Sequence, residues 1–162
     1  MKRKILMAAL MLTAVAMFSG MSFAHNTASG CASRNDVTLS DQQNWKSLCS
    51  KSMTLTDGTH YCVATASAEV TKPAGGQIDN YYLFTIDTES NPTTNSYWER
   101  TINLDDNPGI SDPSMAVVST TRYFNLGAGT YTFYWLGRPS DEGTADTTVE
   151  DYSMGIVCTD GN

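Results

Sequence analysis

Small or apolar residues alternate with polar ones along the segment from Tyr61 to Thr71. The inward-facing set of this alternation is Cys62, Ala64, Ala66, Ala68 and Val70, and the opposite set includes Thr65, Ser67, Glu69 and Thr71. A repeat of two residues is typical of a β-strand with one buried face. Because the buried face carries small side chains, we expect bulky residues from other strands to pack against it.

Later segments supply such residues, again at every second position. These sets are Tyr82, Phe84 and Ile86; Trp98, Arg100, Ile102 and Leu104; Tyr131, Phe133 and Trp135; and Tyr152, Met154, Ile156 and Cys158. Segments rich in Gly, Pro, Asn and Asp separate them, as expected of turns. About seven to eight strands with no helical repeat between them predict an all-β fold, an antiparallel β-sandwich with jelly-roll or Greek-key connections.

One short helical element is expected near the N-terminus. Residues 40–43 have the sequence Ser-Asp-Gln-Gln, in which the first serine and the last glutamine can form a capping box. The pattern predicts a short helical turn through Trp45 and Leu48 that ends near Cys49. From Met53 onward the composition favours strands.

The first residues have the features of a secretory signal peptide. An apolar stretch from Ile5 to Phe18 follows a basic tripeptide, and Ser22-Phe23-Ala24 has the small-x-small form of a cleavage site. The stretch is short for a membrane span. We expect cleavage after Ala24 and a secreted or periplasmic protein.

The four cysteines all follow this leader, so we expect them to form disulfides in an oxidising compartment. Their spacing contains no Cys-x-x-Cys motif. Cys31 can pair with Cys49, and Cys62 with Cys158, because the latter two both face inward in their predicted strands. We therefore divide the chain into a signal peptide (1–24), an N-terminal disulfide-closed segment (25–51) and a β-sandwich domain (52–162).

The charge of the chain argues against some partners. The 162 residues carry a net charge of −7, and the predicted leader contains three of the ten basic residues and none of the 17 acidic ones. An acidic surface repels phosphate backbones and anionic lipids. We expect neither nucleic-acid binding nor membrane binding.

A resemblance to known proteins rests on residues 123–134, with the sequence Tyr-Phe-Asn-Leu-Gly-Ala-Gly-Thr-Tyr-Thr-Phe-Tyr. This segment resembles a hairpin found in many secreted β-sandwiches and a late hairpin of complement globular-head and tumour-necrosis-factor-like jelly rolls. In such a hairpin Leu126 would end one strand and Gly129 would allow the reversal. The resemblance concerns the fold and implies no functional residue.

The strand that follows is apolar on both faces between Tyr131 and Leu136. Packing within the sheet would explain this, and so would a homo-oligomer interface. A third explanation is a platform on which aromatic side chains stack a sugar ring. The candidate residues of that platform are Tyr134, Tyr81, Tyr97 and Trp98.

The sequence contains no common catalytic motif. His60 is the single histidine within the predicted fold, and we expect it on the surface at the start of a strand. If cleavage follows Ala24, however, the new N-terminal His25 could hold copper together with His60. Such a site would resemble the histidine brace of lytic polysaccharide monooxygenases and periplasmic copper carriers.

A calcium site is a further candidate, because a loop with Pro and Gly gathers oxygen ligands. The ligands would be Asp105, Asp106, Asn107 and Asp112. Their spacing differs from that of an EF-hand, so a solvated acidic turn is the preferred interpretation. We expect a non-catalytic binding or structural module without a cofactor, either oligomeric or binding carbohydrate or protein, with the copper protein as the alternative.

Overall fold

A computed structural model describes residues 27–40, 44–72, 80–93, 99–104, 113–140 and 146–161. These residues form an antiparallel sheet of seven strands and contain no helix. The strands are β1 (Thr27–Ser33), β2 (Val37–Leu39), β3 (Lys46–Lys72), β4 (Tyr81–Asp87), β5 (Arg100–Asn103), β6 (Ser114–Pro139) and β7 (Thr147–Gly161). The predicted all-β antiparallel class is confirmed. Within these ranges no helix has the length and hydropathy needed to cross a membrane.

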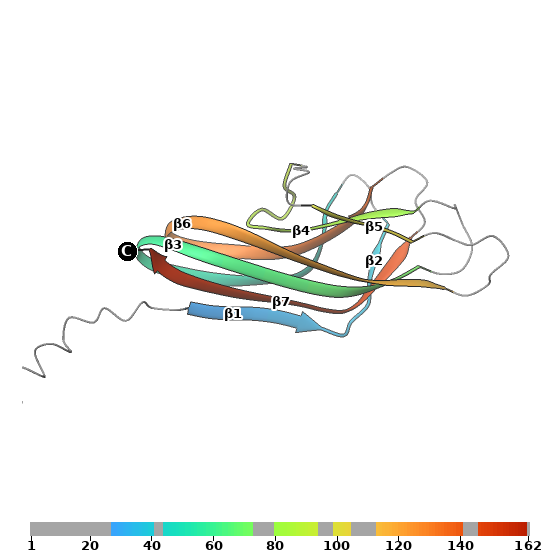
Figure 1. Ribbon diagram of the computed structural model, residues 1–162, viewed down its shortest axis with the longest axis horizontal. Coiled ribbons are helices and arrows are strands. Elements are labelled where there is room, and N and C mark those ends of the chain that lie inside the picture. Colours follow the sequence, from blue (N-terminus) through green and yellow to red (C-terminus); the bar gives the residue numbers. More distant parts are fainter. Residues whose placement is uncertain are drawn as a thin grey trace, which may run out of the picture.

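Hydrogen bonding connects the strands in the order β1-β7-β3-β6-β4-β5, and β2 also pairs with β7. The long strands β3 and β6 run beside each other over almost their whole length (Figure 1). Only one half of β3 pairs with β7, and only the other half of β6 pairs with β4. The two strands therefore pass from one layer of the fold to the other.

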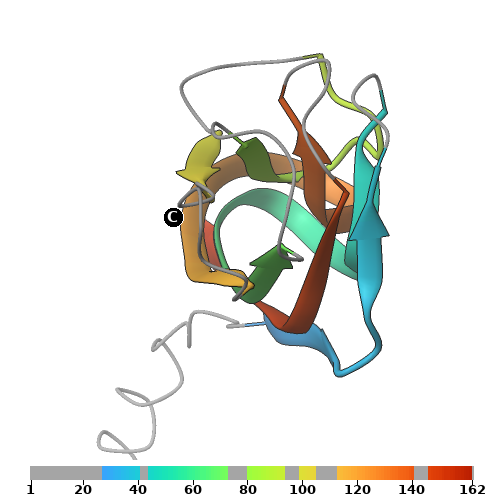
Figure 2. The same cartoon turned by 90° about the vertical axis from the view of Figure 1, so that its right-hand side faces the viewer.

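Phe124 and Phe133 show how sharply β6 bends. Nine residues of straight strand would separate them by about 30 Å, yet their ring centroids lie 5.1 Å apart in an edge-to-face contact. Near this bend Leu55 pairs with Gly129 and Thr59 with Gly127, so β3 carries extra residues as a bulge. The bend folds the β3–β6 ribbon over its own core (Figure 2).

The bend changes the interpretation of residues 123–134. β6 continues through Leu126 and Gly129, so these residues do not form a hairpin, and that prediction is wrong. Chain reversal does occur here, but both arms remain bonded to β3 instead of to each other. Gly129 has a φ of 156°, which a residue with a side chain rarely adopts.

The bend gives the fold two layers, which we call layer 1 and layer 2 and define by their strands. Layer 1 contains β4, β5 and the halves of the long strands in residues 46–55 and 130–139. Layer 2 contains β1, β7 and the halves in residues 59–72 and 114–127, with β2 pairing at one end of β7. Their inner faces enclose one hydrophobic core.

The core confirms the predicted alternation. The small inward residues of β3 from Cys62 to Val70 are buried, as are Tyr82, Phe84 and Ile86 in β4 and the alternating set from Tyr152 to Cys158 in β7. The largest fully buried apolar side chains, Trp135, Tyr82, Phe84 and Phe133, come from layer 1. Bulky residues of one layer thus complement the small residues of the other, as the sequence predicts.

The predicted helical turn is wrong in the part that can be compared, because β3 begins at Lys46 and includes Leu48. Ser47 pairs with Leu136, and Cys49 with Trp135, so hydrogen bonds to β6 replace those of a helix. The strand region also begins earlier than Met53. The capping-box residues 41–43 lie outside the described residues.

Two disulfides have the pairing that the sequence predicts. Cys62 and Cys158 lie directly opposite each other in β3 and β7, and Cys31 of β1 is bonded to Cys49 of β3. The second bridge joins layer 2 to layer 1. The described part of the segment 25–51 belongs to the same sheet as the rest, and β3 runs across the boundary after residue 51. Two disulfides are typical of an oxidising compartment.

Candidate functional site

The outer face of layer 2 carries most of the large exposed hydrophobic side chains in the described ranges. These are Tyr61, Met115, Val117, Tyr123 and Val157, and a sixth, Tyr81, lies in layer 1. Residues opposite each other in an antiparallel pair share a face. Val63 pairs with Tyr123 on one side and with Val157 on the other, so strands far apart in sequence contribute to one surface. Val63, Tyr123 and Val157 thus form an apolar row across three strands, and exposed apolar groups are common in interaction sites.

Small hydroxyl residues lie between the apolar groups on this outer face. Thr65 pairs with Thr121 and Gly155. One row further along, Ser67 pairs with Ser119 and Ser153, and the Ser67 and Ser153 hydroxyls are 3.3 Å apart. Hydroxyl groups both donate and accept hydrogen bonds. The apolar surface is therefore interrupted by a polar strip.

This strip forms a hollow of about 280 Å³, which we call the hydroxyl hollow. It is lined by Thr65, Ala66, Ser67, Ser119, Thr120, Thr121, Ser153 and Gly155. The side chains of the strip are short, whereas Tyr123 on one side and Val117 on the other are 66% and 73% exposed. The difference in side-chain length creates the hollow.

Gly155 leaves part of this hollow open. A Cβ atom added there would meet only the Thr65 Oγ1 atom, at 3.8 Å, and its φ is not positive. Gly30 in the neighbouring strand is different, because a Cβ there would lie 2.5 Å from the carbonyl oxygen of Met154. Gly30 allows β1 to approach β7, whereas Gly155 keeps space free above the sheet.

A second depression, of about 540 Å³, adjoins the hydroxyl hollow at Ser153. Its other lining residues are Ala32, Ser33, Arg34, Asp151 and Tyr152. The exposed Arg34 guanidinium lies 3.9 Å from the Asp151 carboxylate. Together the two depressions cross the sheet from β6 to β1, perpendicular to the strands.

The charges around the outer face are mostly negative. Glu69 and Glu150 lie opposite each other in β3 and β7, and Asp151 follows. Arg34 is the nearby cation, and it already faces Asp151. This charge distribution disfavours an anionic ligand.

The aromatic residues predicted to form a platform are not brought together, so far as they can be placed. Tyr134 pairs with Ser50 and Asp87, and Tyr81 lies six residues from Asp87 along β4. This separation corresponds to about 20 Å of strand. Both belong to layer 1, away from the hydroxyl hollow. Tyr97 and Trp98 lie outside the described residues.

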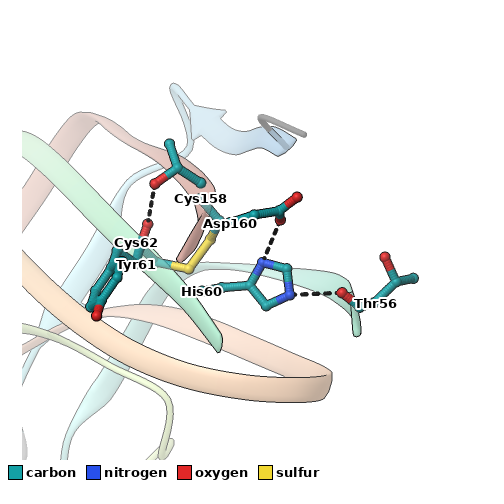
Figure 3. The surroundings of a disulfide bond; sticks show 7 residues. Thr56, His60, Tyr61, Cys62, Cys158 and Asp160 are labelled. Carbon is teal, nitrogen blue, oxygen red and sulfur yellow. Dashed lines mark hydrogen bonds and ion pairs between the residues drawn. A yellow bond between two sulfur atoms is a disulfide. The ribbon is translucent and has the colours of Figure 1, made fainter. Parts of the chain in front are cut away.

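His60 lies beside the Cys62–Cys158 bridge and is buried, with 4% of its surface exposed. The prediction of a surface histidine is therefore wrong. Its Nε2 donates to the Thr56 carbonyl oxygen at 2.8 Å, and its Nδ1 lies 3.0 Å from a carboxylate oxygen of Asp160 (Figure 3). The bulge in β3 places that carbonyl group at the edge of the ring, beside Nε2, where it helps to enclose the imidazole.

Of the metal-site candidates, the structure describes His60 alone. His25 and the calcium candidates Asp105, Asp106, Asn107 and Asp112 lie outside the described residues. Copper binding by His60 would require one of its ring nitrogens to leave its present partner. Within the described part of the chain, no three His, Cys, Asp or Glu residues form a group that could hold a metal ion.

Sequence reasoning did not identify the hydroxyl hollow, although it placed Thr65 and Ser67 on the polar face of their strand. Similar pairs of small residues two positions apart occur in the other two strands, at Ser119 and Thr121 and at Ser153 and Gly155. This shared spacing is the feature of the sequence that could have indicated the hollow. Only the register between the strands shows that the three pairs are adjacent.

No protein-family model matches the chain, and no curated protein matches it in sequence. Several solved structures are similar at low identity. The C-terminal domain of EclA, described as a sugar-binding protein, has 13% identity and a TM-score of 0.39, with coverage of 76% of this chain and 79% of that one. The CBM22-1 xylan-binding domain of Xyn10C from Paenibacillus barcinonensis has 10% identity and a TM-score of 0.37, with 86% of both chains covered.

Dimeric latent PorU from Porphyromonas gingivalis has 9% identity and a TM-score of 0.42, with coverage of 85% of this chain and 13% of that one. None of these likenesses assigns the chain to a family. The comparisons do not show the predicted resemblance to complement globular-head and tumour-necrosis-factor-like domains, and residues 123–134 lack the hairpin on which it rested.

Proposed function

We propose that this chain is a non-catalytic module that binds neutral glycans on the outer face of layer 2. The observation that supports this most directly is the hydroxyl hollow with exposed apolar side chains on either side of it. A sugar chain presents both hydroxyl groups and apolar C–H faces. The outer face offers a counterpart to each.

The arrangement of the two kinds of group fits an extended ligand. Tyr123 and Val117 are six residues apart on β6, which corresponds to about 20 Å of strand. Hydroxyl groups of three strands lie between them. Tyrosine is suited to such a role because its ring is apolar and its hydroxyl group remains in water.

A binding function agrees with the chemistry of the lining residues. The eight residues around the hollow are Thr, Ser, Ala and Gly, which can hold a ligand by hydrogen bonds and van der Waals contact. A hydroxyl nucleophile needs an adjacent general base, and these eight residues include none. The acidic residues nearby favour a neutral glycan over an anionic one.

The test is a binding experiment with a panel of soluble neutral polysaccharides and one anionic polysaccharide, followed by calorimetry with the corresponding oligosaccharides. Tyr123→Ala should weaken binding of the neutral ligand about tenfold, because an aromatic stacking contact contributes about 1.5 kcal/mol. Tyr81→Ala is the matched control, since Tyr81 is an exposed tyrosine in layer 1. Equal loss in both variants, or no binding of any neutral polysaccharide, would reject the proposal.

We also propose that residues 1–24 are removed during export. The basic start, the apolar stretch and the Ser22-Phe23-Ala24 site support this, and the two disulfides agree with an oxidising destination. N-terminal sequencing of the exported protein should begin at His25. A protein that retains Met1 outside the cytoplasm would contradict this.

A further inference from the structure

β1 has an unpaired edge. It stands at one end of the strand order, with β7 on one side and no strand of the described residues on the other (Figure 1). In an antiparallel sheet, alternate residues of such a strand direct their N–H and C=O groups away from the sheet. An exposed edge of this kind accepts another strand unless something protects it.

Two other partly unpaired strands, the layer 1 half of β3 and β5, carry such protection in the residues that the structure describes. The half of β3 in layer 1 contains the exposed Lys46 and Lys51. β5, at the other end of the strand order, is only four residues long and includes the exposed Arg100. Charged side chains and short length both oppose edge-to-edge pairing.

β1 has neither kind of protection. Its sequence, Thr-Ala-Ser-Gly-Cys-Ala-Ser, contains no charged residue and no proline. All seven residues are small, so a neighbouring strand could approach along the whole length without steric conflict. The strand is also fixed in place, because Cys31 is bonded to Cys49 in the other layer.

The sequence of β1 is also nearly symmetric about Gly30. If a second β1 lay antiparallel with Gly30 opposite Gly30, then Ala28 would face Ala32 of the second copy, and Thr27 would face Ser33. Each contact would therefore occur twice, as a two-fold interface requires. We propose that two copies of this chain pair through β1 in this register.

The pairing stands independently of glycan binding, but it has a consequence for the proposed site. Gly30 is opposite Gly155, which is opposite Thr65. Pairing through Gly30 would align this row with the same row of the second copy, so that the two outer faces form one surface. This consequence rests on the proposed function, whereas the dimer does not.

The contact involves seven residues of each copy, so we expect a weak dimer whose population depends on concentration. Sedimentation equilibrium of the full exported chain over a concentration series measures it. Ala28 and Ala32 are exposed on the outer face, which makes them suitable for a charge test. In the proposed register these two positions face each other across the interface.

Two double variants test the register. Ala28→Glu with Ala32→Glu places like charges opposite each other twice and should raise the dimer dissociation constant about tenfold or more. Ala28→Glu with Ala32→Lys places opposite charges together twice and should preserve or strengthen the dimer. Within one chain the two positions are about 13 Å apart, so their charges interact only weakly there. The two double variants should therefore differ mainly in the charge contacts across the interface.

Ala128→Glu, at an exposed position in the bend of β6, controls for added negative charge. Thermal unfolding of each variant checks that the fold is intact. A wild-type chain that stays monomeric throughout the series would overturn the proposal, and so would equal dimerisation of the two double variants. Loss of glycan binding by Tyr123→Ala with an unchanged dimer would confirm that the two proposals are separate.

Discussion

Replacement of Gly155 by valine should separate ligand binding from stability. The added Cβ would have only the Thr65 hydroxyl within 4 Å, at 3.8 Å, so the side chain can enter the hydroxyl hollow without displacing the sheet. A glycine within a strand is less favourable than a residue with a side chain by about 0.5 to 1 kcal/mol. We therefore expect the valine variant to be more stable than the wild type by about that amount.

Binding should change in the opposite direction. Valine would cover the hydroxyls that the hollow exposes. If the ligand loses two hydrogen bonds at about 1 kcal/mol each, its dissociation constant should rise about 30-fold. Calorimetric titration with the neutral oligosaccharide measures binding, and urea unfolding measures stability. Unchanged affinity would show that the hollow is not the site. A large loss of stability would show that Gly155 has a structural role instead.

Three other substitutions test the packing that supports this face, each by urea unfolding. The double variant Cys62→Ala with Cys158→Ala removes a disulfide between residues 96 positions apart, and its unfolding free energy should fall by about 4 kcal/mol. A fall below about 1 kcal/mol would contradict a stabilising role of this disulfide. His60→Leu removes the hydrogen bonds of the buried imidazole to the Thr56 carbonyl oxygen and the Asp160 carboxylate, and should lower the unfolding free energy by about 2 kcal/mol; unchanged stability would argue against both hydrogen bonds. Arg122→Met removes the ion pair with Asp87 and the hydrogen bond to the Ile86 carbonyl, which join β6 to β4, and should lower the unfolding free energy by about 2 kcal/mol. Arg34→Met removes only an exposed ion pair and should change stability little. Equal effects of the two arginine variants would contradict the argument.

The sequence predicted the inner face of the sheet well, because burial imposes a repeat of two that each strand carries alone. The positions from Cys62 to Val70 and from Tyr152 to Cys158 show that repeat and are buried. Their shared inward direction also led to the correct Cys62–Cys158 bridge. Local alternation was sufficient for these features.

The bend and the site required information from distant strands. Gly127 and Gly129 have the composition of a hairpin, yet β3 pairs with both arms of β6 and turns the segment into a bend. Leu48 followed a helix-capping sequence, but its strand is bonded to β6. The hydroxyl hollow depends on the register of three strands. Alternation within one strand gives the direction of a side chain but not its neighbours.

The most direct test of the glycan site is an NMR titration of the isotope-labelled exported chain with the neutral oligosaccharide that binds it best. Backbone amide signals of Thr65, Ser119 and Gly155 should shift together as ligand is added, with one dissociation constant, and Tyr123 should follow them. Shifts confined to the surroundings of Tyr81 in layer 1, or none at saturating ligand, would contradict the account.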